Sequence, residues 1–246
     1  MSSTRASGPI WARPEPGGRR PRFTRRQIAA VALAIADAEG FGAVSMRRIA
    51  AELGAGTMTL YYYVRSKDEL LDLMDEAIMA EVLIPDGELP SGWREALSEI
   101  ARRTRAMFVR HPWALLSLRE AWPGPNAMRH FEQSLAAVAD APLDVAGRLE
   151  LLTIVDDYVF GHALRRGETR TRAAAAGEGA EAALEFGVTH VRSGDYPHLQ
   201  ALIGDADPRD AAAQNAATMM DERQSELQFE RGLRDLLEGA ALRMGA

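Results

Sequence analysis

The sequence predicts an all-α protein with two parts, a small basic one followed by a larger acidic one. Apolar residues recur at helical spacing along most of the 246 residues, and no segment alternates apolar and polar residues for long, as a half-buried strand would. Residues 1–67 hold eleven Arg or Lys against four Asp or Glu, a net charge of +7, which leaves −13 for residues 68–246. This asymmetry favours a module that binds a polyanion, although solvated surface charge is the alternative.

Residues 1–22 are rich in Pro, Gly, Ser and Arg and contain little that could be buried. We expect them to form a disordered basic arm. They lack the apolar stretch that a signal peptide needs, and no later apolar run is long enough to span a bilayer. The chain has no cysteine, which excludes disulfides and cysteine-based zinc sites. We therefore expect a cytoplasmic protein that does not interact with a membrane.

The first part of the chain predicts four helices with recognisable ends. Thr24 with Gln27, and Ser66 with Glu69, have the spacing of capping boxes, in which each side chain satisfies a backbone N–H group at a helix start. Glycines mark two of the helix ends, because Gly adopts the terminating backbone conformation without strain. The expected helices cover about 24–39, 45–53, 57–63 and 66–84.

After Pro90 the periodicity remains helical. Further helices are expected at about 93–110, 113–121, 126–139, 144–166, 180–192 and 208–243. The helix at 144–166 is apolar on more than one face and must be covered on more than one side. Residues 167–179 are expected to form a mobile loop, and the stretch around 193–198 is rich in turn-forming residues.

Residues 45–63 have the layout of a helix-turn-helix, with two short helices joined by a Gly-containing turn. The second helix is too short to be stable alone, so its neighbours must hold it, with Leu60 as the inward anchor. Tyr61, Tyr62 and Tyr63 follow directly, and three consecutive positions span about 200° of a helix. At least one of these tyrosines must therefore face outward.

The outward side chains of this helix suit DNA. A Thr side chain can hydrogen-bond to base edges, the methyl group of Met58 can contact a thymine methyl, and Tyr hydroxyls can donate to phosphates. Lys67 lies beside the N-terminus of the next helix, where backbone N–H groups also attract an anion. The alternative, that the tyrosines are half-buried packing residues, applies most strongly to Tyr62.

Residues 44–74 resemble the DNA-binding domain of the tetracycline-repressor (TetR) family of bacterial transcriptional regulators. The resemblance rests on several spaced elements rather than one short pattern. These elements are R-x-I-A at Arg47–Ala50, Leu53-Gly54, Thr59-Leu60-Tyr61, and Val64-x-Ser66-Lys67-x-x-Leu70. The resemblance implies an N-terminal three-helix helix-turn-helix DNA-binding domain at 23–75 and a larger helical ligand-binding and dimerisation domain at 76–246.

The resemblance also implies roles for individual side chains. Arg47 stands where the family's second helix meets DNA. The wider family usually has Gly where this chain has Met58, so the operator sequence cannot be carried over from a relative. The implied base-reading residues are Thr57, Met58 and Thr59, and the implied phosphate-contacting residues are Tyr61, Tyr63 and Lys67.

Residues 92–116 and 229–240 are similar to the C-terminal domain of the tetracycline repressor subgroup. This similarity implies a homodimer, in which the helices at about 144–166 and 221–243 form an intermolecular four-helix bundle. A dimer also fits the reading of a two-fold operator by two recognition helices. The alternative is that the apolar helix at 144–166 lies at the centre of its own subunit.

The magnesium–tetracycline site of that subgroup does not carry over, because Leu118 and Arg165 replace its histidine and its acidic partner. We expect instead a pocket for a small hydrophobic effector, lined by apolar and aromatic side chains with a few polar anchors. Each aromatic residue could equally belong to the ordinary core. The candidate lining residues are Trp93, Phe108, Trp113, Leu116, Trp122, Phe131, Asp157, Tyr158 and His162. The five histidines lack metal-ligand spacing, so neither a metal nor a cofactor is expected.

These observations predict a ligand-responsive, DNA-binding transcriptional regulator. We expect a repressor that a small hydrophobic molecule releases from a palindromic operator of double-stranded DNA. Arginines within 13–26 would add sequence-independent affinity. One alternative is a sequence-tolerant architectural DNA-binding protein without an inducer. An enzyme with an accessory DNA-binding head is disfavoured, because the sequence has no nucleophile elbow, phosphate loop or metal cluster.

Overall fold

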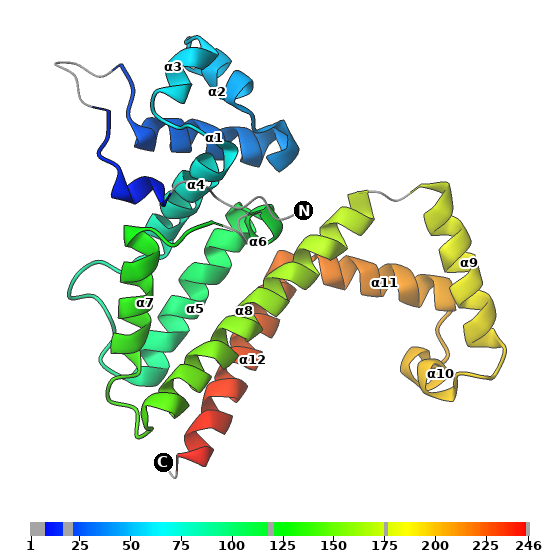
Figure 1. Cartoon of the computed structure of the whole chain (residues 1–246). Helices are drawn as coiled ribbons and strands as arrows, with labels where there is room; N and C mark the ends of the chain where they lie inside the picture. The colour runs from blue at the N-terminus through cyan, green and yellow to red at the C-terminus, as the bar shows by residue number, and fades with distance from the viewer. Residues whose placement is uncertain (1–7, 17–21, 118–120, 175–176, 245–246) are drawn as a thin grey trace. The chain divides into compact units, whose positions relative to one another are not determined.

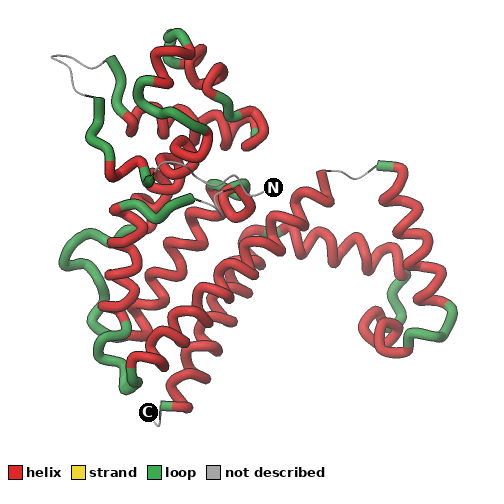
Figure 2. The backbone as a smooth tube through the Cα atoms, in the orientation of Figure 1, coloured by secondary structure: helices red, strands yellow, loops and turns green. Residues whose placement is uncertain are grey.

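The computed structural model describes residues 8–16, 22–117, 121–174 and 177–244. Helices form the fold, and no β-strand occurs in these ranges, as the sequence predicted (Figure 2). The chain divides into two compact units, one made of Met1–Ala163 with Ala240–Ala246 and the other of Leu164–Gly239. Within the described ranges, no helix combines the length and the hydropathy that a membrane span requires.

Helices α1 (Arg25–Glu39), α2 (Met46–Glu52) and α3 (Thr57–Tyr61) form a compact group within the larger unit (Figure 1). The capping box predicted at the start of α1 is present. The Thr24 hydroxyl accepts from the Gln27 backbone N–H at 3.1 Å, and the Gln27 side chain accepts from the Thr24 N–H at 2.9 Å. Helix α1 ends at Gly40, whose φ of 85° lies in the region that favours glycine.

Helix α3 spans five residues and is shorter than the predicted 57–63. Its N-cap residue is Gly56, which has no side chain to accept a backbone N–H. The helix is therefore held by its packing against α2, in which Leu60 is fully buried as the predicted inward anchor. The chain has left the helix by Tyr63.

Helix α4 (Lys67–Val82) connects this group to the rest of the larger unit. It begins after the predicted cap Ser66, whose hydroxyl accepts from the Glu69 backbone N–H at 3.1 Å. Helix α4 packs against α1 and also against α5 (Trp93–Arg110) and α7 (Pro125–Ala137), while the short α6 (Ala114–Ser117) lies between α5 and α7 in the chain. Helix α4 is therefore in contact with both α1 and the α5 and α7 helices.

Two later helices occupy stretches for which the sequence predicted loops or turns. Helix α8 (Val145–Ala174) continues through residues 167–174 of the stretch expected to be a loop at 167–179, where Glu, Arg and Ala residues favour helix enough to outweigh Gly167. Helix α9 (Glu178–Arg192) follows the predicted range closely. Helix α10 (Pro197–Ile203) forms where turns were expected, and it begins with Pro197, whose missing N–H costs nothing at that position.

The single helix predicted over 208–243 is two helices, α11 (Pro208–Met220) and α12 (Glu222–Arg243). Asp221 separates them. Its carboxylate accepts from the Arg223 backbone N–H at 2.8 Å, so it caps the start of α12 instead of continuing α11.

The expectation of a disordered arm over residues 1–22 is wrong for residues 8–16. A short 3-10 turn, η1 (Ile10–Ala12), is ordered there, and Ile10 is only 1% exposed. Arg25 fixes this segment by donating to backbone carbonyls, including that of Arg13 at 2.8 Å. Composition could not reveal this contact, because every residue carries a carbonyl. Residues 1–7 and 17–21 lie outside the described part of the chain.

Candidate nucleic-acid interface

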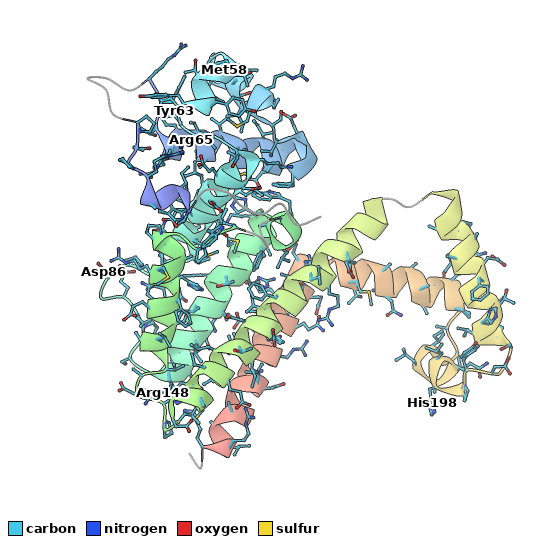
Figure 3. The ribbon with its side chains drawn as sticks, viewed as in Figure 1. Met58, Tyr63, Arg65, Asp86, Arg148 and His198 are labelled. Atoms are coloured by element: carbon cyan, nitrogen blue, oxygen red, sulfur yellow. The ribbon has the colours of Figure 1, made fainter. Side chains whose placement is uncertain are left out.

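The side chains expected to meet DNA come from α2, α3 and the start of α4, and most of them are accessible. Met58 on α3 is 81% exposed, and it lies at the outer edge of its domain (Figure 3). Arg47 and Lys67 are exposed, while Thr57 and Thr59 are half-buried on either side of Met58. A large apolar side chain with so little protein around it is available to another molecule.

The three tyrosines have different surroundings. Tyr61 and Tyr62 are 42% and 64% exposed, whereas Tyr63 is 5% exposed. The Tyr63 ring packs edge-on against Phe23, with ring centroids 6.3 Å apart, and its hydroxyl accepts from the Phe23 backbone N–H at 3.4 Å. The predicted phosphate contact of Tyr63 is therefore corrected. The helix ends before this residue, so the chain turns its side chain inward instead of along the outer face.

Two residues beyond the predicted set are accessible at the same end of the domain. For Tyr62 the sequence favoured a half-buried packing role more than for its neighbours, yet it is the most exposed of the three tyrosines. Arg65 is also exposed and was assigned no role (Figure 3). Its position between α3 and the start of α4, next to a run of aromatic residues, is the sequence signal that could have identified it.

The two adjacent arginines of α2 have separate roles. Arg48 pairs at 2.7 Å with Glu39, which ties α2 to the end of α1, and at 2.7 Å with Glu52 of α2 itself. The Arg47 side chain is exposed and makes no hydrogen bond or ion pair within the described residues. Only Arg47 is thus available to a partner. Lys67, at the first position of α4, lies with its ammonium 5.5 Å from the Phe41 ring centroid.

A buried histidine joins α1, α4 and the end of α5. The Nδ1 atom of His111 lies 2.7 Å from Oδ1 of Asp37, and its Nε2 atom lies 3.2 Å from Oε1 of Glu81. Trp113 donates to the same Asp37 oxygen at 2.8 Å and stacks on Phe41 at a centroid distance of 5.7 Å. These contacts give Trp113 a structural role, and its predicted place in an effector pocket stays a prediction. The Trp113 indole fastens the α5–α6 turn to the DNA-binding helices.

Comparison with known proteins identifies the family. Residues 28–74 match the family described as "Bacterial regulatory proteins, tetR family", and residues 85–243 match "Tetracyclin repressor-like, C-terminal domain". The chain belongs to the TetR family. This membership agrees with the resemblance predicted from residues 44–74 and with the observed all-helical fold.

Several TetR-family proteins are similar to this chain. The repressor DrrR1 of Streptomyces coeruleorubidus is 42% identical over 148 residues, which cover 59% of this chain and 54% of DrrR1. An HTH-type transcriptional regulator of Saccharopolyspora erythraea is 34% identical over 200 residues, covering 80% of this chain and 83% of that protein. Among solved structures, ActR of Streptomyces coelicolor in complex with actinorhodin has a TM-score of 0.65 and 28% identity, covering 89% and 95% of the two chains.

The candidate effector-binding residues of this TetR-family chain fall into different environments. Phe108 and His162 are buried, and Phe108 packs edge-on against Phe160 at 5.4 Å. The rings of Tyr158 and His162 lie 6.5 Å apart. Trp93 is half-buried, with the Arg94 guanidinium 4.6 Å from its ring. Tyr158 and His162 thus lie together on α8, while Phe108 of α5 meets the same helix at Phe160.

The remaining predicted effector-lining residues are not buried in the single chain or lie outside the described residues. Trp122 and Phe131 are exposed, and so is Asp157, which contradicts an enclosed position in this chain by itself. Leu116 lies in α6, and its side chain is outside the described part of the structure, as is Leu118. A single chain therefore supports only part of the predicted lining.

Two titratable residues inside the α4–α7 core were missed by sequence analysis. Burial raises the pKa of Asp75 on α4 to about 7, with smaller contributions from Glu76 and Asp72. Burial also lowers the pKa of His130 on α7, whose Nδ1 atom is buried without a hydrogen-bond partner in the described residues. The burial of one Asp or His on an amphipathic helix leaves no signal in the sequence, because it depends on the neighbouring helices.

Proposed function

We propose that this protein is a transcriptional repressor that binds a two-fold operator as a homodimer and is released by a small hydrophobic molecule. The observation that carries the proposal is the accessible end of the helix-turn-helix. Met58, Tyr61 and Tyr62 are exposed around α3, while Leu60 anchors the same helix from the inside. This arrangement presents side chains to a groove while the backbone is held by the protein.

The chemistry of these side chains suggests how they divide the work. Met58 has no hydrogen-bonding group, so it suits the methyl group of thymine in the major groove. Thr57 and Thr59, half-buried beside it, can reach base edges over a short range. Hydroxyls of the exposed tyrosines and the ammonium of Lys67 suit phosphates, which position the protein without reading sequence. Arg47 adds a charged contact from α2.

A homodimer is supported by an exposed apolar face on α8. Val145, Leu149 and Phe160 are all exposed, and their spacing of four and eleven residues places them on one face of the helix. On α12, Leu227 and Leu242 are also exposed. Apolar residues in such a row lose contact with water when a second copy covers them. Two copies related by a two-fold axis would present two α3 helices to the two halves of an operator.

A hydrophobic effector is supported by the relatives and by Phe108, Tyr158 and His162. Solved structures of ActR, 28% identical to this chain, contain actinorhodin and (S)-DNPA. For this chain we propose an aromatic, largely apolar molecule that contacts α8 at Tyr158 and His162. It would release DNA only if it binds more tightly to a conformation in which the two α3 helices are misplaced.

Footprinting of the purified protein on the DNA upstream of its own gene tests the proposal. A two-fold symmetric protected region is expected, which one compound from a panel of aromatic hydrophobic molecules abolishes. Arg47→Ala should weaken protection at least tenfold. Arg129→Ala is the matched control, because Arg129 is an exposed arginine of α7 that pairs at 2.9 Å with Asp86, and Asp86 lies away from α3 (Figure 3).

The alternative, an architectural DNA-binding protein, gives a different pattern. Its binding would fall steeply with salt but would be the same on unrelated DNA, and no compound would change it. That result would overturn both the operator and the effector parts of the proposal.

A further inference from the structure

The ordered N-terminal segment, residues 9–15, docks on the DNA-binding helices through a buried arginine. Arg25 is 7% exposed, and its guanidinium donates to the carbonyls of Ile10, Arg13 and Pro14 at 3.2, 2.8 and 3.2 Å. In return, the Glu15 carboxylate accepts from the Arg25 backbone N–H at 2.7 Å. Three carbonyls bound by one guanidinium fix the path of this segment across the start of α1.

The same segment contacts the exit of the recognition helix. The carbonyl oxygen of Tyr63, two residues beyond α3, lies 3.4 Å from both Arg13 Nη2 and Arg25 Nε. Arg13 also pairs at 2.7 Å with the buried carboxylate of Glu69, which accepts from the Arg65 backbone N–H at 2.7 Å. The link between α3 and α4 is therefore held from outside by the N-terminal segment.

The other side of the segment reaches the loop before α7. A Cβ atom added at Gly124 would lie 2.8 Å from the Trp11 ring, so the indole packs directly on the backbone there. The α4 carboxylate of Glu76 accepts from the Asn126 backbone N–H at 2.9 Å, which fixes the start of α7 beside the same loop. Trp11 thus extends the contact from the DNA-binding helices to the α4–α7 core.

We propose that residues 9–15 are a positioning segment that holds α3 in a fixed orientation on the α4–α7 core and thereby sets operator specificity. This inference rests on the proposed DNA-binding function. Base contacts tolerate little misplacement of a recognition helix, whereas phosphate contacts from long basic side chains tolerate more. Loosening the segment should therefore reduce specific binding much more than non-specific binding.

Trp11→Ala tests the proposal on two duplexes of equal length, one from upstream of the gene and one unrelated. Affinity for the upstream duplex is expected to fall at least tenfold, while affinity for the unrelated duplex changes less than twofold with the same salt dependence. Trp11→Phe should recover the upstream affinity to within about threefold, because an aromatic ring still fills the space over Gly124.

Arg26→Gln is the matched control, because Arg26 is exposed and directly follows Arg25. This substitution removes one positive charge and leaves residues 9–15 unchanged, so it should lower the affinity for both duplexes by the same factor. If the Arg26 side chain contacts a phosphate, the variant should also have a slope of log binding constant against log salt concentration that is smaller in magnitude by about 0.9. If Trp11→Ala behaves like this control, with equal losses on both duplexes, the positioning role is overturned.

A distance measurement tests the segment without any operator. The chain has no cysteine, so Ala51→Cys on α2 and Ala136→Cys on α7, both exposed, give a specific pair of spin-labelling sites. Labelled chains diluted with excess unlabelled protein report the distance within one chain. Trp11→Ala should broaden this distance distribution at least twofold. An unchanged distribution overturns the inference, and a wild-type protein that binds both duplexes equally overturns the proposed function instead.

Discussion

Removing the imidazole of His111 should loosen the attachment of the DNA-binding helices. This side chain is buried, and it joins Asp37 on α1 at 2.7 Å to Glu81 on α4 at 3.2 Å. Hydrogen bonds to charged groups contribute about 1.5–3 kcal/mol each when buried. Both carboxylates are partly exposed, and each keeps another partner, Trp113 for Asp37 and Arg110 for Glu81.

The expected decrease in the free energy of unfolding is therefore smaller than the contribution of two full hydrogen bonds. We expect His111→Ala to lower the free energy of unfolding by about 2 kcal/mol, from the weakened hydrogen bonds and the lost ring packing. Urea denaturation followed by circular dichroism measures this change. In a double-mutant cycle with Asp37→Ala, a coupling energy of about 1 kcal/mol should appear, because the two side chains are in contact.

A matched control is available in the same chain. His198 is exposed (Figure 3), and His198→Ala should change the free energy of unfolding by less than about 0.5 kcal/mol. If His111→Ala is as mild as this control, or if the cycle with Asp37 shows no coupling, the histidine does not fasten α1 to α5. The α5–α6 turn would then need another route to the DNA-binding helices.

Three further outcomes follow from burial. Leu60→Ala removes the buried anchor of α3 and should lower the free energy of unfolding, measured by urea denaturation, by about 2–5 kcal/mol. Leu202→Ala, at an exposed site, should lower it little. The pKa of Asp75 is raised to about 7, so the free energy of unfolding should fall as pH rises from about 4 through 7, because only the native state keeps the proton over this range. Asp75→Asn should flatten this fall. If the free energy of unfolding of the variant and of the wild type depend on pH in the same way, the prediction is contradicted. Tyr61→Phe should weaken operator binding about threefold to tenfold in gel-shift titrations if its exposed hydroxyl meets a phosphate, while Tyr63→Phe at the buried site should change binding less than twofold.

Several local features were predictable because their signals lie within a few residues of one another. The capping boxes at Thr24 and Ser66 set the starts of α1 and α4 as predicted. Leu60 was the one large aliphatic residue of a helix too short to be stable alone, so its burial followed from the pattern. The family, the all-helical fold and the exposure of Met58 were predictable on the same local basis.

Other features depended on contacts between residues far apart in the chain. Tyr63 turns inward because Phe23, forty positions earlier, provides its packing partner. Trp113 joins the DNA-binding helices because Asp37 and Phe41 lie beside it. The N-terminal segment is ordered because the buried guanidinium of Arg25 binds its carbonyls.

The sequence by itself determined most of the helical segments, where most of them begin, and which family the chain belongs to. Only the tertiary structure decided which aromatic side chains face outward and what holds the recognition helix in place. Helix periodicity and capping depend on neighbours three or four positions away, so they can be recognised in the sequence. Contacts such as a guanidinium with backbone carbonyls leave no residue-specific pattern, because every position carries a carbonyl.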